Sequence, residues 1–221
     1  MRKLRILMLA ICTVISVSES FAQIFEIKTG VNLSTMFSKD RFGNYSKDYT
    51  LTSRFLIGVT TEIPLTELFS IESGLLFSSK GYKLDKYFAM WEDSEPTRNY
   101  LKAVLNYIDI PLSLKASTLF RKLLIYGNVG PYVGIGLSGK IIADESSGDI
   151  IKRNEYRHKM GTDGTWKRFD YGLQAGAGVE INRIVFGLNY SYGLANISQN
   201  RDYENKNRII GLTLGYRFKA S

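Results

Sequence analysis

The chain has 221 residues, 44% of them hydrophobic, with 29 Lys and Arg against 21 Asp and Glu and a formal net charge of +8. A basic balance can suit nucleic acid, but no run of Lys and Arg with interleaved aromatic residues follows one element. We therefore expect no nucleic-acid partner, and anionic lipid headgroups are the expected one.

The first 22 residues have the pattern of a secretory signal. A basic start is followed by an apolar run over residues 6–17 and by a small-x-small site that ends at Ala22. The run is too short to span a bilayer as a helix. We assign residues 1–22 to a cleaved signal peptide and residues 23–221 to one outer-membrane β-barrel domain. The leader holds three Lys and Arg, one Glu and the only cysteine, so the domain keeps a net charge of +6 and has no thiol for a disulfide or a lipid anchor.

Alternation with a period of two predicts β-strands in the rest of the chain. Phe169, Tyr171 and Leu173 alternate with Asp170 and Gly172, for example, and the pattern continues to residue 181. Long strands with one bulky apolar face and one small or polar face are what a tilted membrane-spanning strand requires. We predict eight strands, at residues 24–35, 52–63, 69–81, 99–115, 122–139, 166–181, 184–196 and 207–218.

The predicted connections alternate between short and long. Short turns alternate with long polar loops at residues 36–51, 82–98, 140–165 and 197–206. This is typical of bacterial barrels with short periplasmic turns, long outer loops and both termini in the periplasm. The predicted fold is all-β, an eight-stranded antiparallel up-and-down transmembrane β-barrel. A soluble lipocalin-like barrel is the alternative, but its bulky face would have to point into a narrow interior.

The fourth predicted strand changes phase. Ile108, Ile110 and Leu112 alternate in one phase, whereas Ala103 and Leu105 alternate in the other. A bulge near Asn106 or Tyr107 would reconcile the two.

Charged residues of both signs occupy the inward-facing positions of these strands. In an interior too narrow for bulk water, they predict a paired network that fills the barrel. A gated or proton-conducting path along the carboxylates is the alternative. The expected interior network consists of Glu26, Arg54, Glu62, Glu72, Asp109, Asp170, Glu180 and Arg217, with Lys28 and Lys115 also pointing inward.

Aromatic residues lie mostly near the predicted strand ends. Those that face lipid are expected to form two girdles at the level of the headgroups. The candidates are Tyr107, Tyr126, Tyr132, Trp166, Phe169, Tyr171, Tyr190, Tyr192, Tyr216 and Phe218.

The loop at residues 140–165 holds the candidates for chemistry. His158 is the single histidine, and the loop also contains Ser and Asp residues, but no spacing selects a catalytic triad. The acidic cluster at residues 144–149 lacks the ligand spacing of a calcium loop. We expect no catalytic residue, cofactor or metal. A separate hypothesis is that four cations of this loop contact lipopolysaccharide phosphates: Lys152, Arg153, Arg157 and Lys159.

Five segments resemble the PorT-like outer-membrane β-barrel family of Gram-negative envelopes. They lie at residues 30–34, 106–112, 169–180, 192–196 and 214–218, and Tyr107-Ile108-Asp109-Ile110-Pro111 is the least generic. The resemblance implies an outer-membrane location and assembly by the barrel-insertion machinery. It brings no catalytic residues, and the family takes its name from a member tied to protein secretion.

Together these observations predict a non-enzymatic outer-membrane barrel with a plugged polar interior. Its long extracellular loops would contact the envelope or the cell surface, with outer-membrane lipid and lipopolysaccharide as partners. An accessory role in secretion or transport and a loop-sited enzyme are the alternatives.

Overall fold

The computed structural model describes residues 23–88, 97–147, 150–161 and 165–219. The predicted signal peptide lies outside these residues. Within them the chain forms an antiparallel sheet of ten strands and one 3-10 turn, η2 (Ser46–Asp48), and no helix there is long and apolar enough to cross a membrane. The strands are β1 (Ile24–Lys39), β2 (Tyr49–Thr50), β3 (Thr52–Pro64), β4 (Phe69–Phe88), β5 (Thr97–Phe120), β6 (Leu123–Ser147), β7 (Ile150–His158), β8 (Phe169–Ile181), β9 (Ile184–Gly193) and β10 (Glu204–Lys219).

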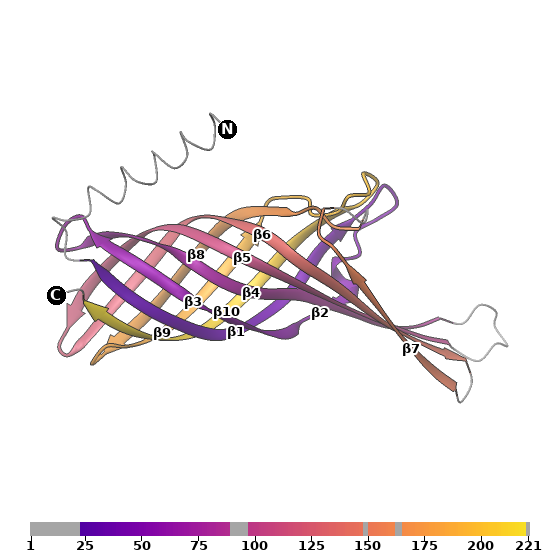
Figure 1. Ribbon diagram of the computed structural model, residues 1–221, viewed down its shortest axis with the longest axis horizontal. Coiled ribbons are helices and arrows are strands. Elements are labelled where there is room, and N and C mark those ends of the chain that lie inside the picture. The colour runs from indigo at the N-terminus through magenta and orange to yellow at the C-terminus, as the bar shows by residue number, and fades with distance from the viewer. Residues whose placement is uncertain (1–22, 89–96, 148–149, 162–164, 220–221) are drawn as a thin grey trace.

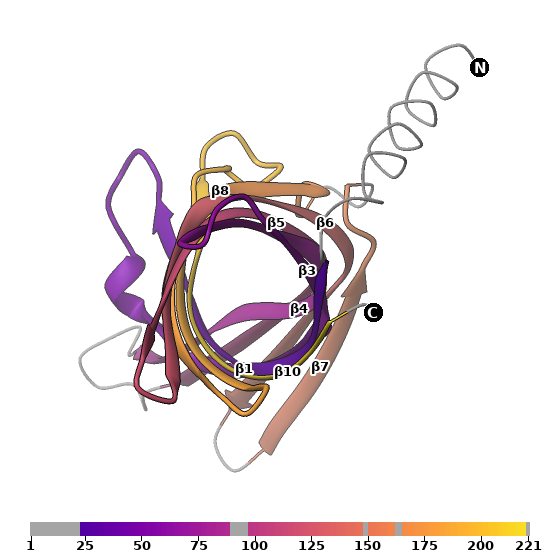
Figure 2. The same ribbon diagram turned by 90° about the vertical axis from the view of Figure 1, so that its left-hand side faces the viewer.

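The sheet closes on itself as an up-and-down barrel. β1 pairs with β3 on one side and with β10 on the other, and the pairing continues through β9, β8, β6, β5 and β4 back to β3. Figure 1 shows the tilted strands from the side, and Figure 2 shows the ring along its axis. Closure pairs the backbone groups of every wall strand with a neighbour, which an open sheet would leave exposed at its edges.

Two strands lie outside this ring, and the sequence did not predict them. β2 pairs with β4 through Tyr49–Leu84 and Thr50–Lys83, and β7 pairs with β6 from Gly139–His158 to Ser147–Ile150. Both lie in segments that we expected to be loops. The predicted count of eight is therefore too low for the sheet as a whole, because these polar strands have no continuous apolar face that would reveal them.

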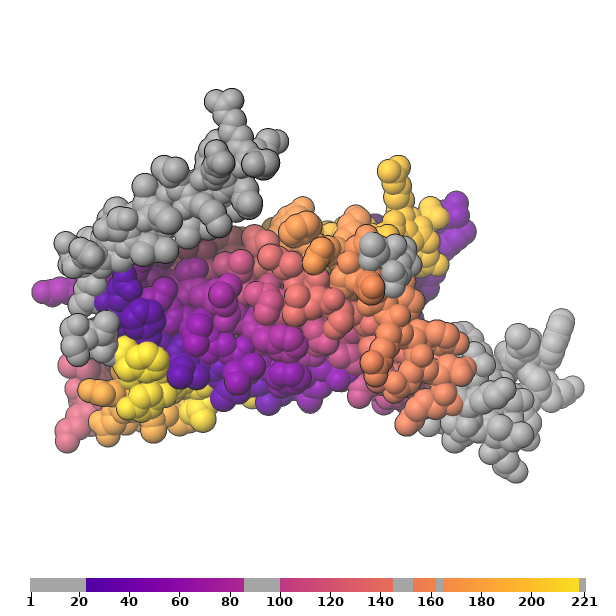
Figure 3. Space-filling view, in the orientation of Figure 1, coloured from indigo at the N-terminus to yellow at the C-terminus, as the bar shows by residue number. Residues whose placement is uncertain are grey.

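Three wall strands also continue into the expected loops. β4 reaches Phe88, β5 begins at Thr97 and β6 reaches Ser147, so the loop after residue 81 and the loop after residue 139 are mostly extended hairpins. With β7 they project beyond the barrel at the end opposite the start of β1 and the end of β10 (Figure 1), and Figure 3 shows the described part of β7 on that side of the barrel.

The alternation in the sequence separates the two faces of the wall. Large apolar side chains such as Ile57, Leu173 and Leu188 are about half exposed on the outer face, whereas Asn32, Thr60 and their counterparts on the inner face are buried. The bulky face points outward, which contradicts the lipocalin-like alternative.

The predicted irregularity between β5 and β6 is present, but its consequence differs from our expectation. The register shifts at Asn106/Tyr107, and the unpaired extra residue is Leu137 of β6. β5 keeps its phase, so Ala103, Leu105 and Tyr107 all point inward and are fully buried. A bulge on one strand bends the pair without reversing the faces of its partner.

Candidate functional site

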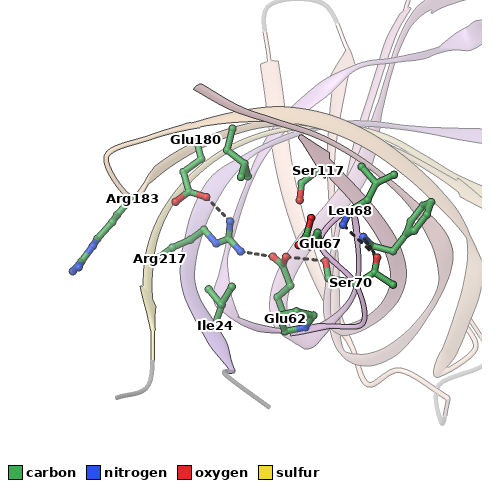
Figure 4. Close-up of a pocket in the computed structure, with 13 residues that line it drawn as sticks. Ile24, Glu62, Glu67, Leu68, Ser70, Ser117, Glu180, Arg183 and Arg217 are labelled. Carbon is green, nitrogen blue, oxygen red and sulfur yellow. Dashed lines mark hydrogen bonds and ion pairs between the residues drawn. The ribbon is translucent and has the colours of Figure 1, made fainter. Parts of the chain in front are cut away.

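Arg217 joins two carboxylates at the end of the barrel where the short turns lie. Its guanidinium donates to Glu62 Oε2 at 2.5 Å and also to the carboxylate of Glu180. Ser70 donates its hydroxyl to the other Glu62 oxygen at 2.8 Å. Figure 4 shows Arg217 between the two glutamates, each on a strand two places away from β10 in the ring.

Lys115 and Lys28 continue this network toward the middle of the barrel. Lys115 Nζ lies 2.8 Å from Glu62 and 3.3 Å from Glu72, and Lys28 Nζ lies 3.0 Å from Glu72 and 3.6 Å from Glu26. The Lys115 ammonium also lies 4.2 Å from the centre of the Tyr126 ring. Three cations and four carboxylates thus form one chain of contacts that runs around the inside of the wall.

A second cluster surrounds Lys80, which is 0% exposed. Its ammonium lies 2.9 Å from Asp109 and 3.1 Å from Asp170. The same oxygen of Asp170 accepts hydrogen bonds from the Asn207 amide at 2.8 Å and the Tyr132 hydroxyl at 3.3 Å. The rings of Tyr107 and Tyr132 cover the ammonium, with their centres at 4.5 and 4.9 Å. Cation–π contact is favourable where water is excluded.

Little space separates the two clusters. The cavity between them has a volume of about 60 Å³ and is lined by Lys28, Glu72, Asp109 and Tyr132 together with neutral polar residues. A volume of this size holds a few water molecules.

Apolar residues close the barrel at the loop end. Met160, Trp166 and Ile197 come from connections between strands and pack on Leu105 and Tyr107 of β5 as one buried cluster. This cap could not be predicted from the sequence, because isolated apolar residues in polar loops show no periodic pattern.

The opposite end is open. A pocket of about 410 Å³ lies between the β3–β4 turn and the ends of β8 and β10, and Glu62, Glu180 and Arg217 line its inner part (Figure 4). The network therefore forms the floor of this opening.

A family model described as "Outer membrane protein beta-barrel domain" matches residues 21–199. The chain belongs to this family. Its strands accordingly form an outer-membrane β-barrel, and the protein resides in the outer membrane. A comparison with curated proteins gave no match.

Several solved outer-membrane proteins are similar to this chain at low sequence identity. Ail of Yersinia pestis is 16% identical, with 89% of this chain and 99% of that chain covered and a TM-score of 0.37. Neisserial surface protein A is 12% identical over 89% and 97%, with a TM-score of 0.41. The N-terminal barrel domain of Pseudomonas aeruginosa OprF is 13% identical over 90% and 98%, with a TM-score of 0.36. At this distance the likenesses carry no argument, and the assignment rests on the family model.

Seven of the eight residues expected in the interior network make the ion pairs described above. Arg54 does not: it is half-buried, and its Nε and Nη2 atoms have no hydrogen-bond partner among the described residues. Lys80 belongs to the interior but was missed, although it shares the sequence phase of Glu72.

Four of the aromatic residues that we listed for the lipid girdles are buried instead: Trp166 lies in the apolar cap, and three tyrosines lie inside the barrel. Tyr107, Tyr126 and Tyr132 are buried against Lys80 or Lys115, whereas Tyr171 and Tyr190 are exposed on the outer face. The sequence could have predicted this for the three tyrosines, because they alternate in the same phase as the glycines and charged residues that face inward.

The loop candidates lie on the projecting hairpin or beside it. Arg153 forms a two-pronged pair with Asp144, with both distances 2.8 Å, and this hydrogen bonding raises the pKa of the guanidinium. Arg157 and Lys159 are exposed, and the side chain of Lys152 lies outside the described part of the chain. His158 Nδ1 lies 3.3 Å from the Thr165 hydroxyl, and its ring meets Trp166 edge-on at 5.6 Å. Asp144 already accepts hydrogen bonds from Arg153. Asp144 and His158 therefore do not form a catalytic pair.

Proposed function

We propose that this protein is a non-enzymatic, eight-stranded transmembrane barrel with a plugged interior. The closed ring of β1, β3, β4, β5, β6, β8, β9 and β10 supports the strand number. A barrel of this size is filled by its own side chains. The outward apolar face of the wall supports a position within the hydrocarbon of the outer membrane.

The main support for a plugged interior is that ion pairs cross the inside of the barrel. The contacts of Arg217, Lys115 and Lys80 reach between strands that are not neighbours, so they cross the space that a channel would need. Buried charges that are paired resist displacement by ions, because breaking one pair leaves the other charge desolvated.

Recording from planar bilayers that contain the folded, full-length mature chain tests this proposal. We expect no current steps above leak at any holding voltage. Heat-modifiable gel mobility of the same preparation establishes that the protein is folded. Steady conductance from a folded preparation would contradict the plugged interior and favour a transport path.

The projecting hairpins supply the surface for envelope or cell-surface contacts. Their cations remain our proposed contacts for lipopolysaccharide: Lys152, Arg153, Arg157 and Lys159. Charge reversal at Arg153 and Arg157 should lower barrel stability in membranes that contain lipopolysaccharide and leave it unchanged in membranes without it. An equal effect in both membranes would rule out the contact.

A loop-sited enzyme is the alternative of another class. It is disfavoured by the surroundings of His158, whose Nδ1 atom lies beside the Thr165 hydroxyl rather than beside a carboxylate. Loss of a lipid-modifying or proteolytic activity in His158→Ala would revive it.

A PorT-like position within the family is a further proposal, supported by the segment at residues 106–112. An accessory role in secretion would follow from it by analogy alone. A secretion defect after deletion of the gene, restored by the intact protein, is the test.

A further inference from the structure

A notch lies where the chain enters β8 at the loop end of the barrel. Its volume is about 550 Å³, and it is lined by Lys167, Arg168, Phe169 and Tyr171. Asn196 and Gln199 of the connection between β9 and β10 also line it. The notch thus joins a pair of cations to a pair of aromatic rings.

The backbone beneath the two cations is held in place. The Lys167 amide donates to Ile197 O at 2.7 Å, and Arg168 O accepts from the Gly136 amide at 2.6 Å. The Gln199 side chain donates to Trp166 O at 3.0 Å, and Trp166 itself is buried in the apolar cap. Lys167 and Arg168 nevertheless have exposed side chains. The two cationic side chains therefore extend into solvent from a backbone that is held by hydrogen bonds.

The aromatic side of the notch continues onto the outer face of the wall. Phe169 is 61% exposed, and Tyr171 and Leu173 follow it outward along β8. Aromatic residues at such positions lie at the boundary between headgroups and acyl chains. The cations immediately before Phe169 accordingly lie at headgroup level.

We propose that this notch binds a phosphorylated glycolipid of the outer leaflet. Lys167 and Arg168 hold its phosphate, and Phe169 and Tyr171 pack against the start of its acyl chains. The inference rests on the proposed membrane orientation and names the ligand class for one position on the rim. An amphiphile fits because a free phosphate would leave the rings unused, whereas an uncharged lipid would leave the cations unused.

The notch is better placed for this contact than the cations of β7. β7 projects away from the wall, and Arg153 already holds Asp144 in a two-pronged pair (Figure 1). Lys167 and Arg168 make no ion pair with a carboxylate of the described residues, and they adjoin the lipid-facing surface.

The test uses the full mature chain folded in vesicles and measures bound lipid by native mass spectrometry. The probes are lipid A with two phosphates and lipid A with both phosphates removed. The variant Lys167→Gln/Arg168→Gln is compared with Arg121→Gln/Lys122→Gln, which removes the same charge from the exposed turn between β5 and β6 at the opposite end of the barrel. We expect affinity for phosphorylated lipid A to fall on the order of fivefold for each rim charge removed, and about 25-fold for the pair. The turn variant should bind as the parent does.

Three results would overturn the proposal. One is that the Lys167→Gln/Arg168→Gln variant binds phosphorylated lipid A as tightly as the parent. Another is that the parent binds lipid A without phosphates as tightly as lipid A with them. The third is full displacement by millimolar inorganic phosphate, which would indicate a free-anion site. A gel-mobility shift on each sample separates these results from failure of the barrel itself, since an unfolded parent chain would show no shift.

Discussion

Lys115 of β5 and Glu62 of β3 form a 2.8 Å ion pair across β4, the strand that lies between them in the wall. The Lys115 side chain is only 1% exposed. Lys28 reaches Glu72 across β3 in the same way. Each pair therefore fixes strands that share no backbone hydrogen bonds, and the interior charges act as cross-braces of the barrel.

Replacing Lys115 by Met should strongly destabilise the barrel. The change leaves Glu62 and Glu72 without their shared cation in a desolvated space, and loss of one buried partner typically costs about 3–5 kcal/mol. Guanidinium unfolding in lipid vesicles, followed by gel mobility, measures the free energy of unfolding. Lys122→Met at an exposed turn is the matched control and should change that free energy by less than about 0.5 kcal/mol. Equal stability of both variants would show that the pair braces nothing.

The outer face of β9 should tolerate no charge near its middle. Leu188 is 53% exposed there and has Leu212 and Ala177 as its cross-strand neighbours. If this face contacts lipid, Leu188→Arg should cost about 2–4 kcal/mol in the free energy of unfolding in vesicles. Tyr156→Arg on projecting β7, which is 51% exposed, should cost almost nothing. Similar costs at both positions would argue against the membrane position of the wall.

Gly139 marks a close approach beneath the apolar cap. A methyl group there would lie 2.5 Å from the Trp166 ring, so Gly139→Ala should displace the indole and destabilise the barrel by about 1–3 kcal/mol. Trp166 fluorescence, recorded in a Trp91→Phe background, should shift to longer wavelength. At Gly127 the nearest atom to an added methyl is 3.8 Å away, and Gly127→Ala should leave the spectrum unchanged. A Gly139→Ala spectrum identical to the parent would refute the packing of the cap.

The β6–β7 hairpin should loosen in acid. A hydrogen bond from Lys140, at 2.8 Å, holds the pKa of the Glu155 carboxyl below its usual value. A depressed carboxyl pKa stabilises the folded hairpin above the unfolded value, and this contribution is lost as the pH falls through the folded pKa. A spin label at Asn154 should therefore become more mobile below about pH 4. The effect should be small, because the pair is exposed, and Glu155→Gln should reduce the pH dependence. A spin-label mobility that does not change with pH in the parent would contradict this prediction.

The sequence predicted the walls well and the loops poorly. Strands such as β8 and β9 follow directly from alternation, because each side chain there meets either lipid or the narrow interior. β7 was missed because its backbone pairing with β6 needs no apolar face. Ala103 and Leu105 were assigned to the wrong side, because their apolar character was taken as contact with lipid rather than with the cap.

For the interior network too, the sequence predicted one part and missed another. Phase alone placed Glu62, Asp170 and Arg217 inside, since a period of two assigns a face to every residue of a strand. Their partners could not be predicted, because pairing depends on strand tilt and register across the ring. The sequence by itself thus determined a lipid-facing barrel with charges inside. Only the tertiary structure decided that Lys80 faces two aspartates and that Met160, Trp166 and Ile197 close one end, because these contacts join residues whose separation along the chain carries no period.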